Sequence, residues 1–516
     1  MTLLSLKFFV VFLAILVVYY ILPGKFQWGW LLLSSLFIYY KEASWQLLLV
    51  FLIYIGINWV ASLFMEENAP HRKVAFRTAI ILDIALLAIF KYMDFIAQIV
   101  LYFIRLINPG YASDKFDLLV YYCEKYAPIR ISYFALIIIS YLIDVYWGKV
   151  AVQKNPGKVL LFASYFPQMT SGPIVQYEMM QNELFGDKHR FDYNNFVMGA
   201  ERIIWGLFKK MVISDRCSTI VNTIYENYLL YAGFYIPFGA AMFALQLYTD
   251  FSGLMDIVLG ISQCLGINLP ENFQTPFYSV NLSEFWRRWH ITLGAFLRDY
   301  VLYPIERSKP WKKLRKFCKN KFGKGYERKF NLPLYLALFI SWFLIGLWHG
   351  GGWNYIFGVG LYMWLVIVLG ELLTPVFSWL IKVLRINTEC FSWKLFQRTR
   401  TFFLFIFGLS FFRAKSLKDG FLMWKSAFSL CNPWIFFDHS LLKLGLSQSE
   451  WLILLLGLLL LIAVSILMQS GSVREKLHKQ NFVFRLLLFV VLFVMIINWG
   501  CYGADFVAED FIYGRF

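Results

Sequence analysis

The chain has 516 residues, of which 59% are hydrophobic and 16% are charged, and it carries a formal net charge of +17. A soluble protein of this length would need several domains with charged surfaces, so the composition excludes that class and indicates a multi-pass membrane protein. The long apolar runs also exclude an outer-membrane barrel, because the strands of a barrel are shorter and alternate in polarity.

Apolar stretches long enough to cross a bilayer of roughly 30 Å recur along the whole chain. The clearest of them cover residues 3–22, 78–107, 131–147, 334–348, 354–373, 451–468 and 483–499. Together with weaker stretches, they predict an all-α, polytopic fold with about eleven or twelve transmembrane helices. The first stretch has no small-residue cleavage pattern before Pro23, so we expect an uncleaved helix rather than a removed signal.

Two apolar segments, residues 153–192 and 264–310, are interrupted by prolines at positions 167, 173, 270, 276 and 304. Irregular backbone at membrane depth is tolerated only where protein or a water-filled cavity covers its polar groups. We therefore expect re-entrant segments around a central cavity, bordered also by the helix that ends at His349.

Basic residues concentrate between positions 306 and 330, where eleven lysines and arginines are opposed by Glu306 and Glu327. Such an excess marks cytoplasmic loops, so we expect a cytoplasmic loop that attracts the anionic headgroups of the lipid bilayer. An alternative is a basic rim for the phosphates of a nucleotide-bearing donor. Nucleic acid binding is disfavoured, because no nucleic-acid module surrounds the charge. Smaller basic clusters, read in the same way, lie at 71–77, 207–216, 382–400 and 474–485.

The basic loops also predict the orientation of the chain. With residues 306–330 inside, the helix over 332–348 rises by roughly 25 Å and places His349 in the outer half of the membrane. The stretch 483–499 also starts at a basic loop and crosses outward, so the terminal tail with Tyr513 should emerge on the same side as His349.

The seven cysteines are scattered, with no CxxC pair and no histidine at metal-binding spacing. We interpret them as free and mostly buried thiols. We therefore expect neither a disulfide nor a metal site, and no bound cofactor.

Two histidines lie in tryptophan-rich clusters of this apolar chain. His290 belongs to Phe-Trp-Arg-Arg-Trp-His-Ile-Thr-Leu, and His349 to Gly-Leu-Trp-His-Gly-Gly-Gly-Trp-Asn. Titratable groups at membrane depth are costly and serve chemistry or transport. Acyl transfer from a thioester to a hydroxyl needs a base, stabilisation of the oxyanion and exclusion of water. An imidazole suits the base, and the glycines after His349 should let the backbone pack close to an acyl chain.

The ordered motifs of the chain resemble the membrane-bound O-acyltransferase family, specifically its bacterial alginate O-acetyltransferase branch. The stretches that carry the resemblance are 165–174, 206–216, 248–253, 269–273, 285–293, 297–300, 347–350 and 511–513. Each stretch alone is a weak signal, but the ordered set is specific. The resemblance implies a helical ring with re-entrant segments around a central tunnel, which runs from a cytosolic donor entrance to an outer acceptor face.

The resemblance also implies the organisation of the chain and its activity. Residues 1–150 would form N-terminal transmembrane helices, residues 151–500 the catalytic core, and residues 501–516 an extracytoplasmic tail. The expected enzyme of the cytoplasmic membrane uses acetyl-CoA as donor to O-acetylate an extracellular or cell-wall polysaccharide, with a secreted or membrane-anchored SGNH-type acetyltransferase as partner. The alternatives are D-alanyl transfer toward teichoic acid and a transporter or flippase, which the lack of internal repeats disfavours.

The resemblance places His349 at the central histidine of the family, as a catalytic residue. His290 falls where family members carry His or Asn, and it is the second catalytic candidate: it either holds the donor, orients a partner or is a satisfied core group. The candidates for donor binding are Arg287, Arg288, Arg298, Trp348, Asn354 and Asp250. The arginines suit either donor phosphates or pairing with Glu284 or Asp299, whereas Asp250 should bond a neighbouring helix or an arginine.

The tail ends in Phe-Ile-Tyr-Gly-Arg-Phe, where the family has Phe-Ile-Tyr-Phe-Gln-Phe. Tyr513 either anchors the tail at the headgroups or accepts an acyl group and passes it to an external partner. Two further departures are Tyr-Pro-Ile-Glu-Arg at 303–307, in place of Pro-Leu-Gly-Gly, and Met363 near the position of a second family histidine. These departures bear on acceptor docking more than on the reaction class.

Overall fold

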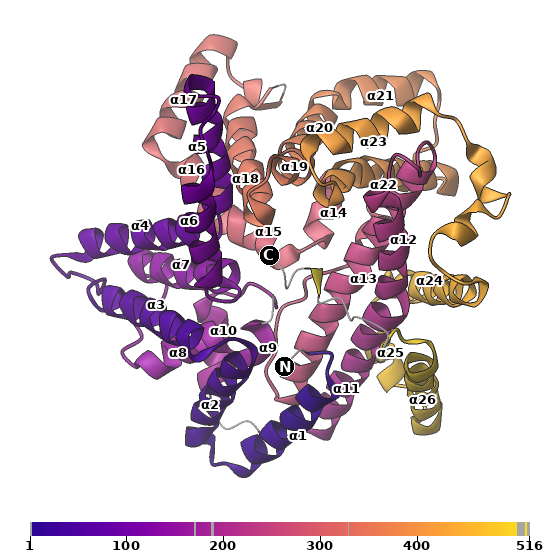
Figure 1. Cartoon of the computed structure of the whole chain (residues 1–516). Helices are drawn as coiled ribbons and strands as arrows, with labels where there is room; N and C mark the ends of the chain where they lie inside the picture. Colours follow the sequence, from indigo (N-terminus) through magenta and orange to yellow (C-terminus); the bar gives the residue numbers. More distant parts are fainter. Residues whose placement is uncertain (1–2, 170–171, 187–189, 329, 503–510, 513–516) are drawn as a thin grey trace. The chain divides into compact units, whose positions relative to one another are not determined.

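The computed structural model describes residues 3–169, 172–186, 190–328, 330–502 and 511–512. These residues are mostly helical, and the extended pairing among them is one isolated bridge between Phe273 and Trp289 (Figure 1). The predicted all-α fold is therefore confirmed.

The chain divides into two compact units. The first unit comprises Met1–Trp205, Leu254–Pro270 and Asp510–Phe516, and the second comprises Gly206–Gly253 and Glu271–Glu509. Helix α13 (Tyr235–Cys264) contributes residues to both units.

The first unit consists largely of helices that are joined by short connecting segments. They are α1 (Leu6–Ile21), α2 (Gly24–Glu42), α3 (Trp45–Leu63), α4 (Arg72–Phe90), α5 (Met93–Ile107), α6 (Asp114–Lys125), α7 (Ile131–Trp147), α8 (Pro156–Ser164), α9 (Phe166–Met169), α10 (Tyr177–Phe185) and most of α11 (Tyr193–Phe208). The apolar run 78–107, predicted as one stretch, lies in two helices that break at Lys91 and Tyr92. The sequence concealed this break because neither residue is a glycine or proline, the usual marks of a turn.

The proline-broken segment of the first unit forms the short helices α8, α9 and α10. The predicted interruption is confirmed, and the re-entrant course around a cavity stays a prediction. The irregular backbone of this segment is hydrogen-bonded by neighbouring side chains. The carbonyl oxygen of Pro173 accepts from the Tyr133 hydroxyl at 2.7 Å and from the Gln168 amide at 2.8 Å, and both side chains are buried. Protein groups thus satisfy backbone that a lipid could not.

The second unit has a π-helical segment near its start and contains most of the sequence motifs. Its elements are the π-helical η1 (Lys209–Ser214), α12 (Asp215–Glu226), the first part of α13, η2 (Pro276–Tyr278), α14 (Leu282–Arg288), α15 (Ile291–Leu297), the π-helical η3 (Arg298–Leu302), α16 (Tyr303–Arg307), α17 (Lys309–Phe322), η4 (Tyr326–Arg328), α18 (Leu332–Gly350), α19 (Trp353–Tyr355), the π-helical η5 (Ile356–Leu361), α20 (Tyr362–Leu372), α21 (Thr374–Val383), α22 (Phe391–Arg413), α23 (Leu417–Ser429), η6 (Pro433–Phe436), η7 (Ser440–Lys443), α24 (Gln448–Met468), α25 (Val473–His478) and α26 (Phe482–Trp499).

The basic segment 306–330 is mainly the helix α17 rather than the open loop that we expected. Lysine and arginine have good helix propensity, and Pro310 lies in the first turn, where its missing N–H costs nothing. Gly323, with φ +84°, follows the last helical residue and ends the helix.

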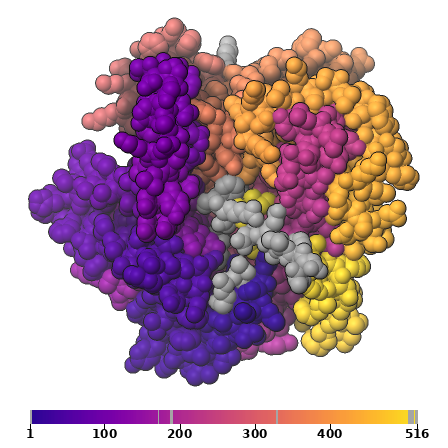
Figure 2. Space-filling model, in the orientation of Figure 1, coloured from indigo at the N-terminus to yellow at the C-terminus, as the bar shows by residue number. Residues whose placement is uncertain are grey.

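Five helical segments within the described residues are long and apolar enough to cross a membrane. They are α3, α18, the segment Trp353–Leu372, α24 and α26, and the shorter apolar helices α1 and α7 accompany them. Figure 2 shows α26 (yellow) standing out from the surface of the second unit, and only 11% of this span is buried. These helices support a multi-pass membrane protein; the number of eleven or twelve segments and the tunnel remain predictions.

Candidate active site

His349 lies in the last turn of α18. Gly351 follows this helix in the left-handed conformation, with φ +66°, and its N–H donates to the carbonyl oxygen of Leu347 at 3.0 Å. The imidazole is 3% exposed and lies among aromatic rings, with ring centroids 4.9 Å from Trp348 and 5.4 Å from Phe412. The glycine cap thus ends the helix where the imidazole enters an aromatic environment.

The glycines around His349 serve packing within the protein, which corrects our expectation of room for an acyl chain. A Cβ on Gly350 would lie 2.6 Å from the ring of Tyr355, and one on Gly352 would lie 2.5 Å from Oδ1 of Asn354. The chain's own side chains therefore occupy the space that these glycines leave.

Helix α18 also packs closely on the segment that follows it. A Cβ on Gly346 would lie 2.6 Å from the Cα of Ile356, the first residue of η5. Glycine lets the two backbones approach, as small residues do between membrane helices. This contact fixes the end of α18 that carries His349.

His290 occupies the turn between α14 and α15 in the left-handed conformation, with φ +47°. Its Nδ1 lies 3.2 Å from Oδ1 of Asn272, which also accepts from the backbone N–H of Thr292 at 3.0 Å and from its hydroxyl at 3.1 Å. Because a carbonyl oxygen only accepts, Nδ1 must carry the proton in this bond, and the lone pair of the neutral ring is on Nε2. Asn272 thus sets both the orientation and the tautomer of His290.

The structure brings the two predicted histidines together around one indole. The Trp348 ring centroid lies 4.9 Å from that of His349 and 5.9 Å from that of His290. The ring of His290 also makes an edge contact with that of Phe251, with their centroids 4.8 Å apart. Three of the predicted site residues, from two elements distant in sequence, therefore form one cluster, the histidine–indole cluster of His290, Trp348 and His349.

The predicted donor-binding arginines have protein partners or lie on the surface. Arg288 pairs with Glu284 at 2.5 Å, Arg298 pairs with Asp299 at 2.9 Å, and Arg287 is exposed. These are the structural pairings that we had weighed against donor phosphates.

Asn354, the other polar candidate, has a partner in the protein. Its side-chain amide donates to the carbonyl oxygen of Ala414 at 3.1 Å, directly after α22. It thereby ties α19 to the end of α22, and donor binding by Asn354 and the arginines remains a prediction.

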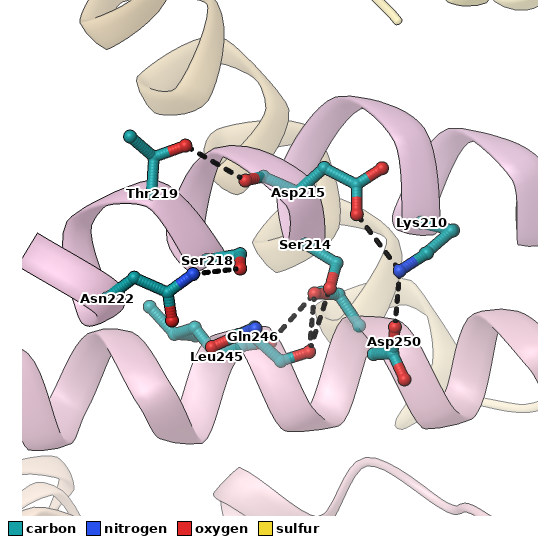
Figure 3. Close-up of polar contacts among 10 residues, drawn as sticks. Lys210, Ser214, Asp215, Ser218, Thr219, Asn222, Leu245, Gln246 and Asp250 are labelled. Carbon is teal, nitrogen blue, oxygen red and sulfur yellow. Dashed lines mark hydrogen bonds and ion pairs between the residues drawn. The ribbon is translucent and has the colours of Figure 1, made fainter. Parts of the chain in front are cut away.

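Asp250 belongs to a buried charge cluster that the sequence analysis missed. The Lys210 ammonium lies 2.8 Å from Oδ1 of Asp250 and 2.9 Å from Oδ1 of Asp215, and all three side chains are at most 5% exposed (Figure 3). Asp250 thus bonds a neighbouring helix, as expected, but through a lysine rather than an arginine. We call these three residues the lysine triad.

The lysine triad corrects the interpretation of residues 207–216 as a cytoplasmic loop. Lys209, Lys210 and Arg216 are buried in η1 and α12. The signal that could have found them was present, since these charges lie in the apolar motif Gly-Leu-Phe-Lys-Lys-Met-Val-Ile-Ser-Asp-Arg. Charge inside an apolar stretch is retained where it is paired.

One turn of α13 connects the lysine triad to the histidine–indole cluster. Asp250 faces Lys210, and the next residue, Phe251, contacts His290. The Lys209 ammonium also donates to the Ser252 hydroxyl at 2.9 Å, so two neighbouring lysines of η1 bond to this turn. The lysine triad therefore positions Phe251, the aromatic residue of α13 that contacts His290.

Two other residues complete the comparison with the sequence. Met363, near the position of the second family histidine, is fully buried and belongs to the core. Tyr513 lies outside the described residues.

The chain combines apolar helices long enough to cross a membrane with two imidazoles that are buried around one indole. The chain is a member of the membrane-bound O-acyltransferase family, whose model matches residues 3–319. It is therefore an O-acyltransferase, which removes the transporter alternative. The match ends before His349, so the assignment of this residue rests on its motif and on its place in the histidine–indole cluster.

Named relatives agree with this class. A probable alginate O-acetylase of Pseudomonas syringae is 29% identical over 436 residues, which are 82% of this chain and 74% of the relative. A peptidoglycan O-acetyltransferase of Helicobacter pylori is 30% identical and covers 63% of this chain and 61% of its own length. A teichoic acid D-alanyltransferase of Bacillus subtilis is also 30% identical, over 45% of this chain and 56% of the relative.

Proposed function

We propose that the protein takes acetyl groups from cytosolic acetyl-CoA and delivers them across the cytoplasmic membrane for the O-acetylation of an extracellular or cell-wall polysaccharide. The observation that carries this proposal is the similarity to alginate O-acetylases, which extends over 82% of the chain. The similarity to the D-alanyltransferase covers only 45% and supports the alternative donor less well.

The histidine–indole cluster supports acyl transfer by general-base chemistry. His349 would take the proton of the acceptor's hydroxyl group while the hydroxyl oxygen bonds to the thioester carbon. As the carbon–sulfur bond breaks, His349 would give that proton to the leaving thiolate. The burial of His349, at 3% exposure, helps to exclude the water that would hydrolyse the donor. His290, oriented by Asn272, would hold the donor or the acyl carbonyl beside it.

The donor can be tested directly with the full chain reconstituted in vesicles. With labelled acetyl-CoA as donor, labelled acetyl groups should appear on the polysaccharide acceptor. A carrier protein charged with D-alanine should transfer no D-alanine to it. The expectation follows from the similarity to alginate O-acetylases, which extends over 82% of the chain against 45% for the D-alanyltransferase. Transfer of D-alanine with no transfer of acetate would establish the alternative donor and contradict the proposal.

Tyr513 would carry the acetyl group to the outer partner, an SGNH-type acetyltransferase that modifies the glycan. In this relay the phenol oxygen bonds the acetyl carbon while His349 takes the phenol proton, and the thiolate leaves with that proton. A hydroxyl of the partner later takes the acetyl group from the phenyl ester, and the released phenolate receives the proton of that hydroxyl. Tyr513→Phe keeps the ring, and with it any anchoring at the headgroups, but removes the nucleophile. It should abolish glycan acetylation at unchanged membrane abundance.

Mass spectrometry of the C-terminal peptide provides the matching readout for this relay. An acetyl adduct on Tyr513 should accumulate when the partner is absent, and it should disappear in Tyr513→Phe. Normal glycan acetylation by Tyr513→Phe would instead show that the tyrosine is an anchor and that the acceptor meets the donor directly.

A further inference from the structure

Helix α17 carries a row of lysines, which we call the lysine stripe: Lys309, Lys312, Lys313, Lys316 and Lys319. Spacings of three and four residues place these side chains on one face, since an α-helix turns once in 3.6 residues. All five are exposed. The lysine stripe thus presents a row of positive charges along about 15 Å of helix.

The lysine stripe has no acidic partner in the part of the chain that the structure describes. The ion pair of this helix joins Arg315 to Glu306 at 2.9 Å, and no described carboxylate lies within 4.0 Å of a stripe ammonium group. Like charges one helical turn apart repel one another. The helix would therefore gain stability from an external anion.

The opposite face of α17 is fixed to the start of a membrane span. Cys318 on that face is fully buried, and the indole N–H of Trp311 donates to the carbonyl oxygen of Pro333 at 2.9 Å. Pro333 is the second residue of α18, one of the five candidate spans. Figure 1 shows α17 beside α16 and α18. The bond to Pro333 thus places α17 where the span begins, at the level of the lipid headgroups.

Exposed aromatic rings accompany the lysines. Phe317 and Phe322 are 57% and 52% exposed, and the Lys321 ammonium lies 5.8 Å and 5.6 Å from their ring centroids. Aromatic rings beside basic residues are typical of helices that lie in the membrane interface. The phosphates of one small molecule are bound by groups that converge on one point. A row of single charges instead matches the headgroups of a lipid surface.

We propose that the lysine stripe binds the headgroups of anionic phospholipids and holds α17 along the membrane surface. Each bound lysine contributes electrostatic attraction that decays within a Debye length. Because α17 is bonded to the start of α18, the anionic lipid content of the membrane would set how firmly this part of the second unit is held. This proposal is independent of the acyl group that the enzyme transfers.

A fluorescent probe beside the stripe tests the proposal. Asn320 is exposed and adjacent to Lys319, so Asn320→Cys can carry the probe in full-length protein whose accessible cysteines, Cys390, Cys431 and Cys501, are replaced by serine. The protein is placed in nanodiscs of phosphatidylcholine with increasing phosphatidylglycerol. Quenching of the probe by a headgroup spin-labelled lipid should rise with phosphatidylglycerol and fall at high salt.

Matched lysine substitutions separate the stripe from net charge. Replacing the five stripe lysines by glutamine should weaken the apparent affinity for phosphatidylglycerol at least about tenfold, because each replacement removes one attraction to the anionic headgroups. The control replaces five other exposed lysines that lie outside the basic clusters, Lys115, Lys415, Lys418, Lys425 and Lys443, and should change it little. Circular dichroism of both variants verifies that they remain folded.

Two results would overturn the assignment to lipid. Quenching that is the same with and without phosphatidylglycerol, or unchanged in the stripe variant, would show that the lysines do not bind lipid. A response to coenzyme A in nanodiscs of phosphatidylcholine alone, lost in the stripe variant, would assign the lysines to the donor's phosphates instead.

Discussion

Replacement of His349 with alanine is expected to abolish glycan O-acetylation while the protein still inserts into the membrane. Loss of a general base costs roughly 10²–10⁴-fold in rate, which would bring the product close to background. Labelled acetate in the isolated glycan measures the effect, and immunoblotting of membranes measures the abundance of the protein.

A second histidine substitution serves as a control for the loss of an imidazole elsewhere in the protein. His439 is exposed in the second unit and lies outside the histidine–indole cluster. His439→Ala should therefore retain full acetylation. Wild-type acetylation by His349→Ala would refute the catalytic assignment, whatever the result for His439.

Replacement of Lys210 with methionine should produce the largest loss of stability among single substitutions in the second unit. Methionine fills a similar volume but leaves the carboxylates of Asp215 and Asp250 buried beside each other without the ammonium between them. Removing one partner from a buried ionic cluster costs about 3–5 kcal/mol. The measurement is the thermal unfolding midpoint in detergent, with the exposed Lys425→Met as the surface control.

The lysine triad also predicts recovery when its charges are removed together. Lys210→Met combined with Asp215→Asn and Asp250→Asn leaves no charge in the triad and should unfold at a higher temperature than Lys210→Met alone. If Lys210→Met alone unfolds like the wild type, the triad is not an energetic element of the fold. Because Asp250 precedes Phe251, which contacts His290, the single substitution should also lower activity.

The sequence predicted the parts of the protein that follow from polarity alone. The two histidines were identified because imidazoles are rare in apolar surroundings, and the structure places both against Trp348. The helical class followed from the lengths of the apolar runs. The bordering helix that ends at His349 was predicted to within two residues of its bounds, Leu332–Gly350.

The parts that the sequence did not predict depend on contacts between distant residues. Lys210 resembled a topology signal because its partner Asp250 lies 40 residues away. The glycines after His349 suggested open space, whereas Tyr355 fills it through a packing contact that no local pattern encodes. Likewise, Asn272 could not be recognised as the partner of His290 without the turn that brings them together.

The left-handed backbone at His290 limits which amino acids can replace this residue. Non-glycine residues rarely adopt that conformation, and asparagine and histidine are among those that do so most readily. Both can also donate a hydrogen bond to Oδ1 of Asn272, histidine through Nδ1–H and asparagine through its amide. The occurrence of either His or Asn at this place in the family then has a backbone explanation. Since an amide cannot act as a general base, an exchange of one for the other would preserve the contact with Asn272 and remove any proton transfer at position 290.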